Sequence, residues 1–92
     1  MKVNLAIEIK DIEGKPIQGE PMLLSKVIGN ALFTAEEKDD PIRVYELAKK
    51  IYYSESEIEI TKSDADLIKE KVKAKGFTVI ILAPLFEALS DK

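Results

Sequence analysis

The sequence predicts a small α+β domain, in which a bundle of three to four helices carries a minor N-terminal β-hairpin or sheet. Two patterns predict this class. Apolar residues alternate near the N-terminus, and three later stretches combine helical apolar spacing with start or stop signals. A chain of 92 residues is long enough for one hydrophobic core. We therefore interpret residues 1–92 as a single domain.

The N-terminal segment alternates in hydrophobicity from Val3 to Ile9, as a half-buried strand does. Glu13 and Gly14 suit a hairpin tip, because glycine accepts positive φ. Pro16 cannot donate a ladder hydrogen bond and belongs on a sheet edge. We expect an extended hairpin over about residues 3–18, with residues 58–60 as a short strand of the same minor sheet.

The first predicted helix covers about residues 22–35 and contains Gly29. A glycine inside a helix costs about 1 kcal/mol relative to alanine, so it needs a reason. A close helix crossing is the preferred explanation, and a hinge or ligand contact is the alternative. The charged residues 36–40 then form a link that we expect to be solvated, with a cation or partner site as the alternative.

The second predicted helix, about residues 41–53, has the strongest signals. Asp40 can cap it, and Pro41 suits its first position. Two lysines, Lys49 and Lys50, favour its C-terminal end. Its predicted buried face is a stripe of four residues, Ile42, Tyr45, Ala48 and Tyr52, which Val44, Leu47 and Ile51 widen.

The third predicted helix covers about residues 63–75. Thr61 and Asp64 have the spacing of a capping box, and Ser63 is the alternative cap. Gly76 is placed to end the helix. Across the three helices we expect one buried core, made of Leu24, Ile28, Leu32, Tyr45, Ala48, Ile51, Leu67 and Ile68.

The C-terminal stretch is the most apolar and the least determined. Residues 77–82 could form a strand or open a helix, and both remain open. Pro84 favours a helix starting just before it, over about 83–90. We expect Leu85 and Leu89 to be partly exposed, at the edge of a self-association or partner surface. The residues expected to be core here are Val79, Ile81, Leu82 and Phe86.

Composition bears on the possible chemistry. The chain has no histidine and no cysteine, so the commonest general base, the commonest metal ligand and thiol nucleophiles are missing. It has no glycine-rich phosphate loop and no calcium-loop spacing. We expect no enzymatic activity, no cofactor, no metal and no small-molecule substrate. We also expect no signal peptide and no membrane span, and hence a cytoplasmic location.

Two kinds of partner are compatible with the pattern. The leading hypothesis is a protein-interaction module that binds another protein or itself, with Tyr53, off the apolar face, as the exposed aromatic residue together with Leu85 and Leu89. The alternative is a weak nucleic-acid-binding regulator that uses the lysine-rich helix 62–75. The net charge of −3, the interleaved acids and a single arginine, Arg43, weigh against nucleic acid.

A resemblance adds to the leading hypothesis. The order of motifs is similar to that of short phage- and prophage-encoded proteins of unassigned function. The resemblance implies a non-enzymatic accessory or assembly role and carries no catalytic residues; Pro84 departs from the pattern, which continues as an uninterrupted helix there. The matching pieces are Lys10-Asp11-Ile12-Glu13-Gly14-Lys15, Ala31-Leu32, Asp40-Pro41 with Tyr45, Ala48-Lys49-Lys50-Ile51-Tyr52, and Thr61-Lys62-Ser63-Asp64.

Overall fold

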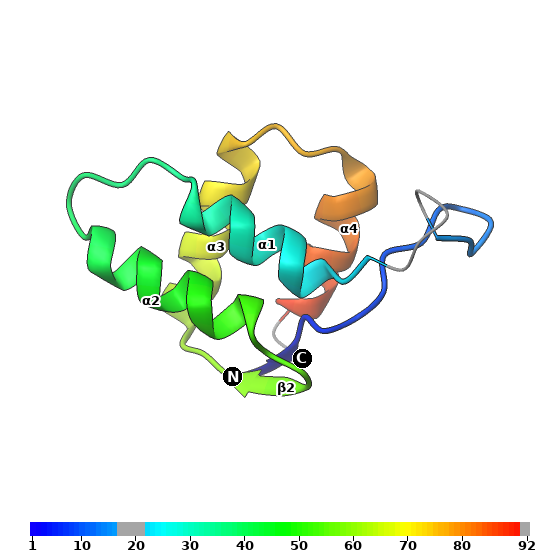
Figure 1. The fold of residues 1–92 in the computed structure, drawn as a ribbon, viewed down its shortest axis with the longest axis horizontal. Coiled ribbons are helices and arrows are strands. Elements are labelled where there is room, and N and C mark those ends of the chain that lie inside the picture. The colour runs from blue at the N-terminus through cyan, green and yellow to red at the C-terminus, as the bar shows by residue number, and fades with distance from the viewer. Residues whose placement is uncertain (17–21, 91–92) are drawn as a thin grey trace.

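The computed structural model describes residues 1–16 and 22–90, and it confirms the small α+β class (Figure 1). Within this part of the chain, four helices form the body and two short strands pair at its lower edge. In chain order the elements are β1 (Lys2–Asn4), α1 (Leu24–Phe33), α2 (Pro41–Tyr52), β2 (Glu57–Glu59), α3 (Lys62–Ala74) and α4 (Val79–Ala88).

The sheet differs from the predicted hairpin. β1 pairs antiparallel with β2, with Val3 opposite Ile58, so the partner of β1 lies more than 50 residues away along the chain. The predicted return arm forms no strand in its described part; its only pairing is an isolated bridge between Lys10 and Pro16. Ile17 and Gln18, which the prediction placed in that arm, lie outside the described residues. Turn chemistry fixed the reversal at residues 11–15, but it could not show that β1 would pair elsewhere.

Gly29 explains how α1 and α2 pack. A Cβ atom built on Gly29 would lie 2.7 Å from the Cβ and 2.9 Å from the Cα of Tyr52. The missing side chain therefore lets the two antiparallel helices approach at this point, as the preferred interpretation of Gly29 predicted. Of the helix pairs, α1 and α2 pack most extensively.

The helix ends largely follow their predicted chemistry. The Asp40 carboxylate accepts a hydrogen bond from the Arg43 backbone N–H at 3.3 Å and caps α2. Thr61 and Asp64 form the reciprocal capping box of α3, at 3.0 and 3.1 Å. Gly76 follows α3 with a φ of 77°, the left-handed conformation typical of a helix stop.

The C-terminal stretch is a single helix that begins earlier than predicted. α4 starts at Val79 instead of residue 83, which answers the open question about 77–82 in favour of helix, and Pro84 lies inside it. Proline leaves the carbonyl one turn back without a helical donor, and that residue, Ile80, is partly open to solvent. Since α4 is a helix from Val79, Ile81, Leu85 and Leu89 recur every four residues on its inner side, and all three are buried.

The core lies between the four helices and is covered below by the N-terminal segment. Most of the predicted core is buried, but Tyr45 is 44% exposed, Leu67 only packs at the edge, and Val79 is 74% exposed. The predicted core residues that are buried are Leu24, Ile28, Leu32, Ala48, Ile51, Ile68 and Ile81; Leu82 and Phe86 are partly buried against them. The core also takes in Val3, Leu5 and Ile9 of the N-terminal segment.

No helix in the described part of the chain has the length and apolar character that crossing a membrane requires.

Candidate functional site

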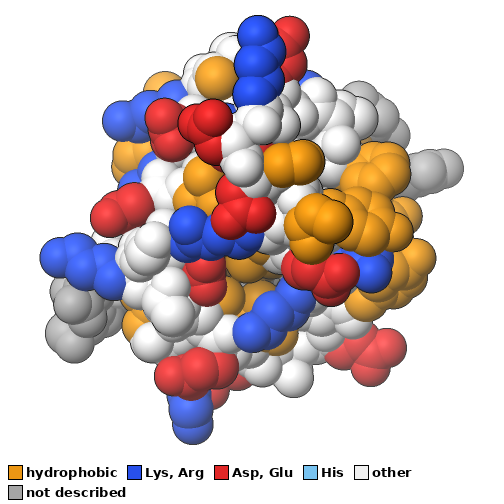
Figure 2. All heavy atoms as spheres, turned by 90° about the vertical axis from the view of Figure 1, so that its left-hand side faces the viewer, with side chains coloured by type: hydrophobic (Ala, Val, Ile, Leu, Met, Phe, Trp, Pro, Cys, Tyr) orange, Lys and Arg blue, Asp and Glu red, His pale blue; other side chains and the backbone are white. Residues whose placement is uncertain are grey.

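The strongest candidate site is a groove on the outer side of the α1–α2 pair. Gly29 brings the helices together, and residues on both sides of the crossing then line a hollow of about 310 Å³. We call this hollow the aromatic groove; its lining consists of Gly29, Asn30, Phe33, Tyr45, Ala48, Lys49, Tyr52 and Tyr53. In Figure 2, hydrophobic side chains gather along the right-hand side, which is the side that faces the viewer in Figure 1.

Two pairs of aromatic rings occupy opposite ends of the aromatic groove. Phe33 and Tyr45 have ring centroids 5.8 Å apart with an interplanar angle of 41°. Tyr52 and Tyr53 have centroids 5.1 Å apart and meet edge to face at 78°. Phe33 is 61% exposed and Tyr53 72% exposed. Aromatic pairs of this geometry attract each other, and together they present a large apolar surface to solvent.

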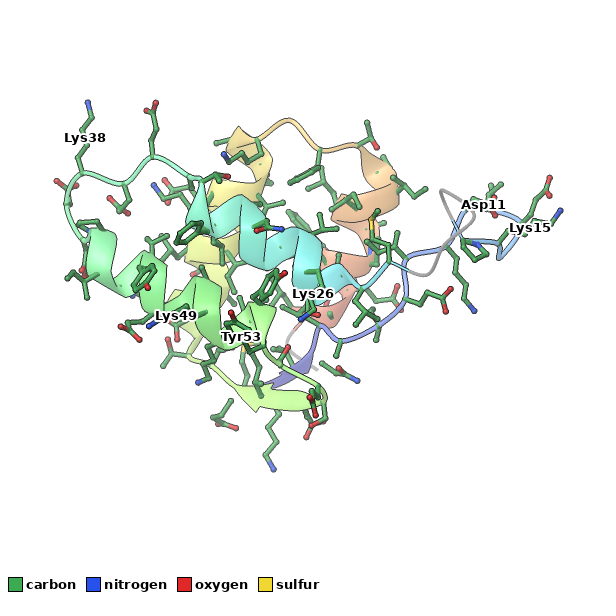
Figure 3. The ribbon with its side chains drawn as sticks, in the orientation of Figure 1. Asp11, Lys15, Lys26, Lys38, Lys49 and Tyr53 are labelled. Atoms are coloured by element: carbon green, nitrogen blue, oxygen red, sulfur yellow. The ribbon has the colours of Figure 1, made fainter. Side chains whose placement is uncertain are left out.

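A lysine lies over a tyrosine ring at each end of the aromatic groove. The Lys26 Nζ is 4.2 Å from the Tyr52 ring centroid and donates a 2.7 Å hydrogen bond to the Tyr52 carbonyl. The Lys49 Nζ is 4.4 Å from the Tyr45 ring centroid and 3.7 Å from the Glu46 carboxylate. Figure 3 shows Lys26 beside Tyr53, with Lys49 to their left, closer to the start of α2. The groove therefore combines aromatic walls with positive charge at its rim.

Sequence reasoning found part of this site. Tyr53 is exposed, as its position off the apolar face predicted. Tyr45 was placed in the core, and this was wrong because the buried stripe of α2 is Val44, Leu47, Ala48 and Ile51. The prediction treated Val44, Leu47 and Ile51 as the edge of the buried face, but they lie at its centre. Tyr45 and Ile42 therefore turn outward. The polar residues Arg43, Glu46 and Lys50 bound the stripe and do not by themselves locate its centre.

The other two predicted partner residues do not belong to this surface. Leu85 and Leu89 are buried, so the expected partial exposure is wrong. The expectation rested on their position near the end of the chain, whereas packing within the fold decides which side of α4 faces the core. With the helix beginning at Val79, both leucines join Ile81 on the core side.

The lysine-rich helix also differs from a free basic surface. Lys71 donates to the Glu36 carbonyl at 2.8 Å and lies 3.4 Å from the Glu37 carboxylate. Lys75 donates to the carbonyl and hydroxyl oxygens of Thr34, both at 2.8 Å. Lys69 and Lys73 lie over the Phe86 ring at 5.5 and 5.2 Å. Four lysines of this segment thus hold α3 to the α1–α2 link and to α4.

The link between α1 and α2 is less uniformly solvated than predicted. Glu36, Lys38, Asp39 and Asp40 are exposed, but Glu37 is half-buried against Lys71. The backbone N–H of Asp39, and after it the Lys71 ammonium, hold the pKa of Glu37 below its ordinary value, against some desolvation. Glu37 is therefore a structural ion-pair partner in this otherwise exposed link.

Other parts of the molecule offer weaker candidates. Within residues 1–16 and 22–90, no group of three or more acidic, histidine or cysteine side chains is placed to hold a metal. The Ser25 hydroxyl is buried, and in the described part of the chain it has no hydrogen-bond partner. A larger hollow of about 630 Å³ lies between the N-terminal segment and α4, and its charged side chains are Lys2 and Glu87. None of these combines a nucleophile with a base.

No family model, no curated protein and no solved structure matches this chain.

Proposed function

We propose that this chain is a non-enzymatic protein-interaction module and that the aromatic groove is its binding surface. The observation that carries the proposal is the exposure of Phe33, Tyr45 and Tyr53 around one hollow. Exposed apolar patches with a polar rim mark interaction sites. Tyrosine is among the residues that contribute most binding energy at protein interfaces, since it gives a large contact area and loses little conformational entropy.

The contacts of the lysine-rich helix weigh against the alternative, a nucleic-acid-binding regulator that uses residues 62–75. Lysines that neutralise phosphates must face solvent and release counterions. Lys71 and Lys75 instead bond to the chain between α1 and α2, and Lys69 and Lys73 cover Phe86. The acidic net charge of −3 adds to the argument.

The proposal also includes a biological setting. The resemblance in motif order supports an accessory or assembly role in a phage or prophage, acting in the cytoplasm on another protein or on a second copy of this chain. Leu85 and Leu89 are buried and offer a partner no surface, so the proposed contact is made by the aromatic groove.

The experiment compares three purified, tagged chains: the native sequence, a groove variant carrying Phe33→Ala with Tyr53→Ala, and a control carrying Val79→Ala. All three substitutions fall on exposed side chains, so each chain should keep its thermal midpoint within a few degrees. We expect the native and control chains to retain the same protein from a host lysate, and the groove variant to lose it.

Two results would reject the proposal. One is a groove variant that retains the same proteins as the native chain and also self-associates to the same extent. The other is binding of mixed-sequence DNA at low salt that disappears as salt rises and survives the groove substitutions, which would favour the nucleic-acid alternative.

A further inference from the structure

The most solvent-exposed apolar side chain in the described part of the molecule is Ile12, and it lies far from the core. It is fully exposed, and it belongs to the loop of residues 11–15, whose Asp11 and Lys15 lie at the right of Figure 3. Single exposed apolar residues are common on protein surfaces. Ile12 differs because the loop beneath it is fixed by its own hydrogen bonds.

Asp11 organises this loop. One oxygen of its carboxylate accepts hydrogen bonds from the backbone N–H groups of Glu13 and Lys15, both at 2.9 Å. Its carbonyl accepts from the Gly14 N–H at 2.9 Å, and its own N–H donates to the Lys15 carbonyl at 2.8 Å. Gly14 has a φ of 82°, a backbone conformation that residues with a side chain rarely adopt. These hydrogen bonds hold the backbone that carries Ile12, so little backbone entropy is lost on binding.

The chemistry of this tip complements that of the aromatic groove. Ile12 is an aliphatic anchor between two acidic residues, Asp11 and Glu13. The groove offers aromatic walls with Lys26 and Lys49 at its rim. The ion pair between Glu13 and Lys15 is 3.5 Å long and about 70% exposed on both sides, so it is easily exchanged for another partner. At about 310 Å³ the groove is at the small end of ligand pockets, which suits one side chain.

The loop does not serve the groove of its own chain. Figure 3 shows Asp11 and Lys15 at one end of the molecule, projecting away from the helices that carry Lys26, Lys49 and Tyr53. A loop that fills the groove must then come from another chain. Every copy carries both a loop that exposes Ile12 beside the Glu13 carboxylate and an aromatic groove with lysines at its rim.

We propose that the occupant of the aromatic groove is the loop of residues 11–15 from a second copy of this chain, with Ile12 between the aromatic rings and the Glu13 carboxylate near Lys26 or Lys49. This inference rests on the proposed function, since it names the partner of the same groove. The two surfaces differ, so the contact is head-to-tail and each pair leaves one loop and one groove free for further copies. A contact made by one loop buries little surface, so we expect weak affinity.

The experiment is sedimentation velocity of the full chain over a concentration series reaching the millimolar range, with three variants. The loop variant carries Ile12→Asp, the groove variant carries Phe33→Ala with Tyr53→Ala, and the control carries Val79→Asp. We expect the native and control chains to associate progressively, and the loop and groove variants each to stay monomeric. Since all these side chains are exposed, circular dichroism should report an unchanged fold.

Mixing the loop and groove variants gives the decisive result. The loop variant keeps its groove and the groove variant keeps its loop, so a mixture should form one-to-one dimers that grow no further. A monomeric native chain, association that survives Ile12→Asp, or a mixture that stays monomeric would each overturn the inference.

The proposed function fails separately from this inference. If the native chain is monomeric but the groove variant still loses a retained host protein, the groove binds a different partner and only the inference falls. If the groove substitutions change neither self-association nor retention of a host protein, both fall.

Discussion

α2 and α4 are helices of similar length that contribute to the same core, yet they were unequally predictable. α2 has charged residues at Arg43, Glu46 and Lys50, which limit the faces that can be buried. α4 is apolar almost all round, with Glu87 as its one charged residue. When a helix has a polar face, its sequence indicates approximately which side faces the core. When it has none, the contacts with the rest of the fold decide which side is buried.

The two helices also start differently. α2 begins with a side-chain cap from Asp40 followed by Pro41. α4 begins after Thr78, whose side chain makes no capping hydrogen bond, and it carries Pro84 in its interior. Local chemistry thus favours α2 as a helix before any tertiary contact forms. α4 depends more on the burial of Ile81, Leu85 and Leu89.

The largest expected effect comes from shortening one side chain on each side of α4, which tests whether this helix has a fixed inner side. Leu85→Ala removes a fully buried side chain and should lower the free energy of unfolding by about 2–5 kcal/mol. Val79→Ala, at an exposed position of the same helix, should change it by less than about 0.5 kcal/mol. Urea unfolding followed by circular dichroism measures both. Equal losses would mean that α4 has no fixed inner side.

A second test concerns the α1–α2 crossing. Gly29→Ala improves helix propensity by about 1 kcal/mol. The added methyl group would meet the backbone of Tyr52 at 2.9 Å, and such overpacking costs about 1–3 kcal/mol. We expect a net loss on the order of 1 kcal/mol in urea unfolding. Asn30→Ala, at the exposed neighbouring position, is the matched control and should be neutral or slightly stabilising. A stabilised Gly29→Ala chain would show that the crossing tolerates a side chain.

The smallest expected effect is a pH dependence at the junction of α2 with α3. Asp64 caps α3 and lies 3.0 Å from the Arg43 guanidinium. Burial alone would raise the pKa of Asp64, but hydrogen bonds from the Thr61 N–H and from Arg43 outweigh it and hold that pKa below its ordinary value of 3.8. The carboxylate therefore stabilises the fold above about pH 4, and this contribution is lost as the pH falls through the lowered pKa.

Acid titration of the thermal midpoint tests this expectation. Asp64→Asn should lower the midpoint at neutral pH and flatten its fall between about pH 4 and 2. Asp66→Asn, at an exposed position of the same helix, is the matched control. If the two variants follow the same profile, the junction does not contribute to acid sensitivity.

The candidate site was only partly predictable, for the same reason that separates α2 from α4. Tyr53 was identified because it falls off the apolar face of its helix. Tyr45 and Phe33 were not, because their exposure depends on where α1 meets α2. The lysines of α3 looked like a basic surface in sequence, since nothing in their spacing reveals that Thr34, Glu36 and Glu37 lie within their reach.

Capping, turn and helix-stop preferences depend on residues a few positions apart, so the sequence alone determined the features that they set. The caps at Asp40 and Thr61, the stop at Gly76, the turn at Gly14 and the α+β class all follow from hydrogen-bonding groups and backbone preferences that neighbours share. The tertiary structure decided the pairing of β1 with β2, the inner side of α4 and the outward turn of Tyr45. Each of these depends on contacts between distant segments, whose competing arrangements bury similar apolar surface, so only the packed chain distinguishes them.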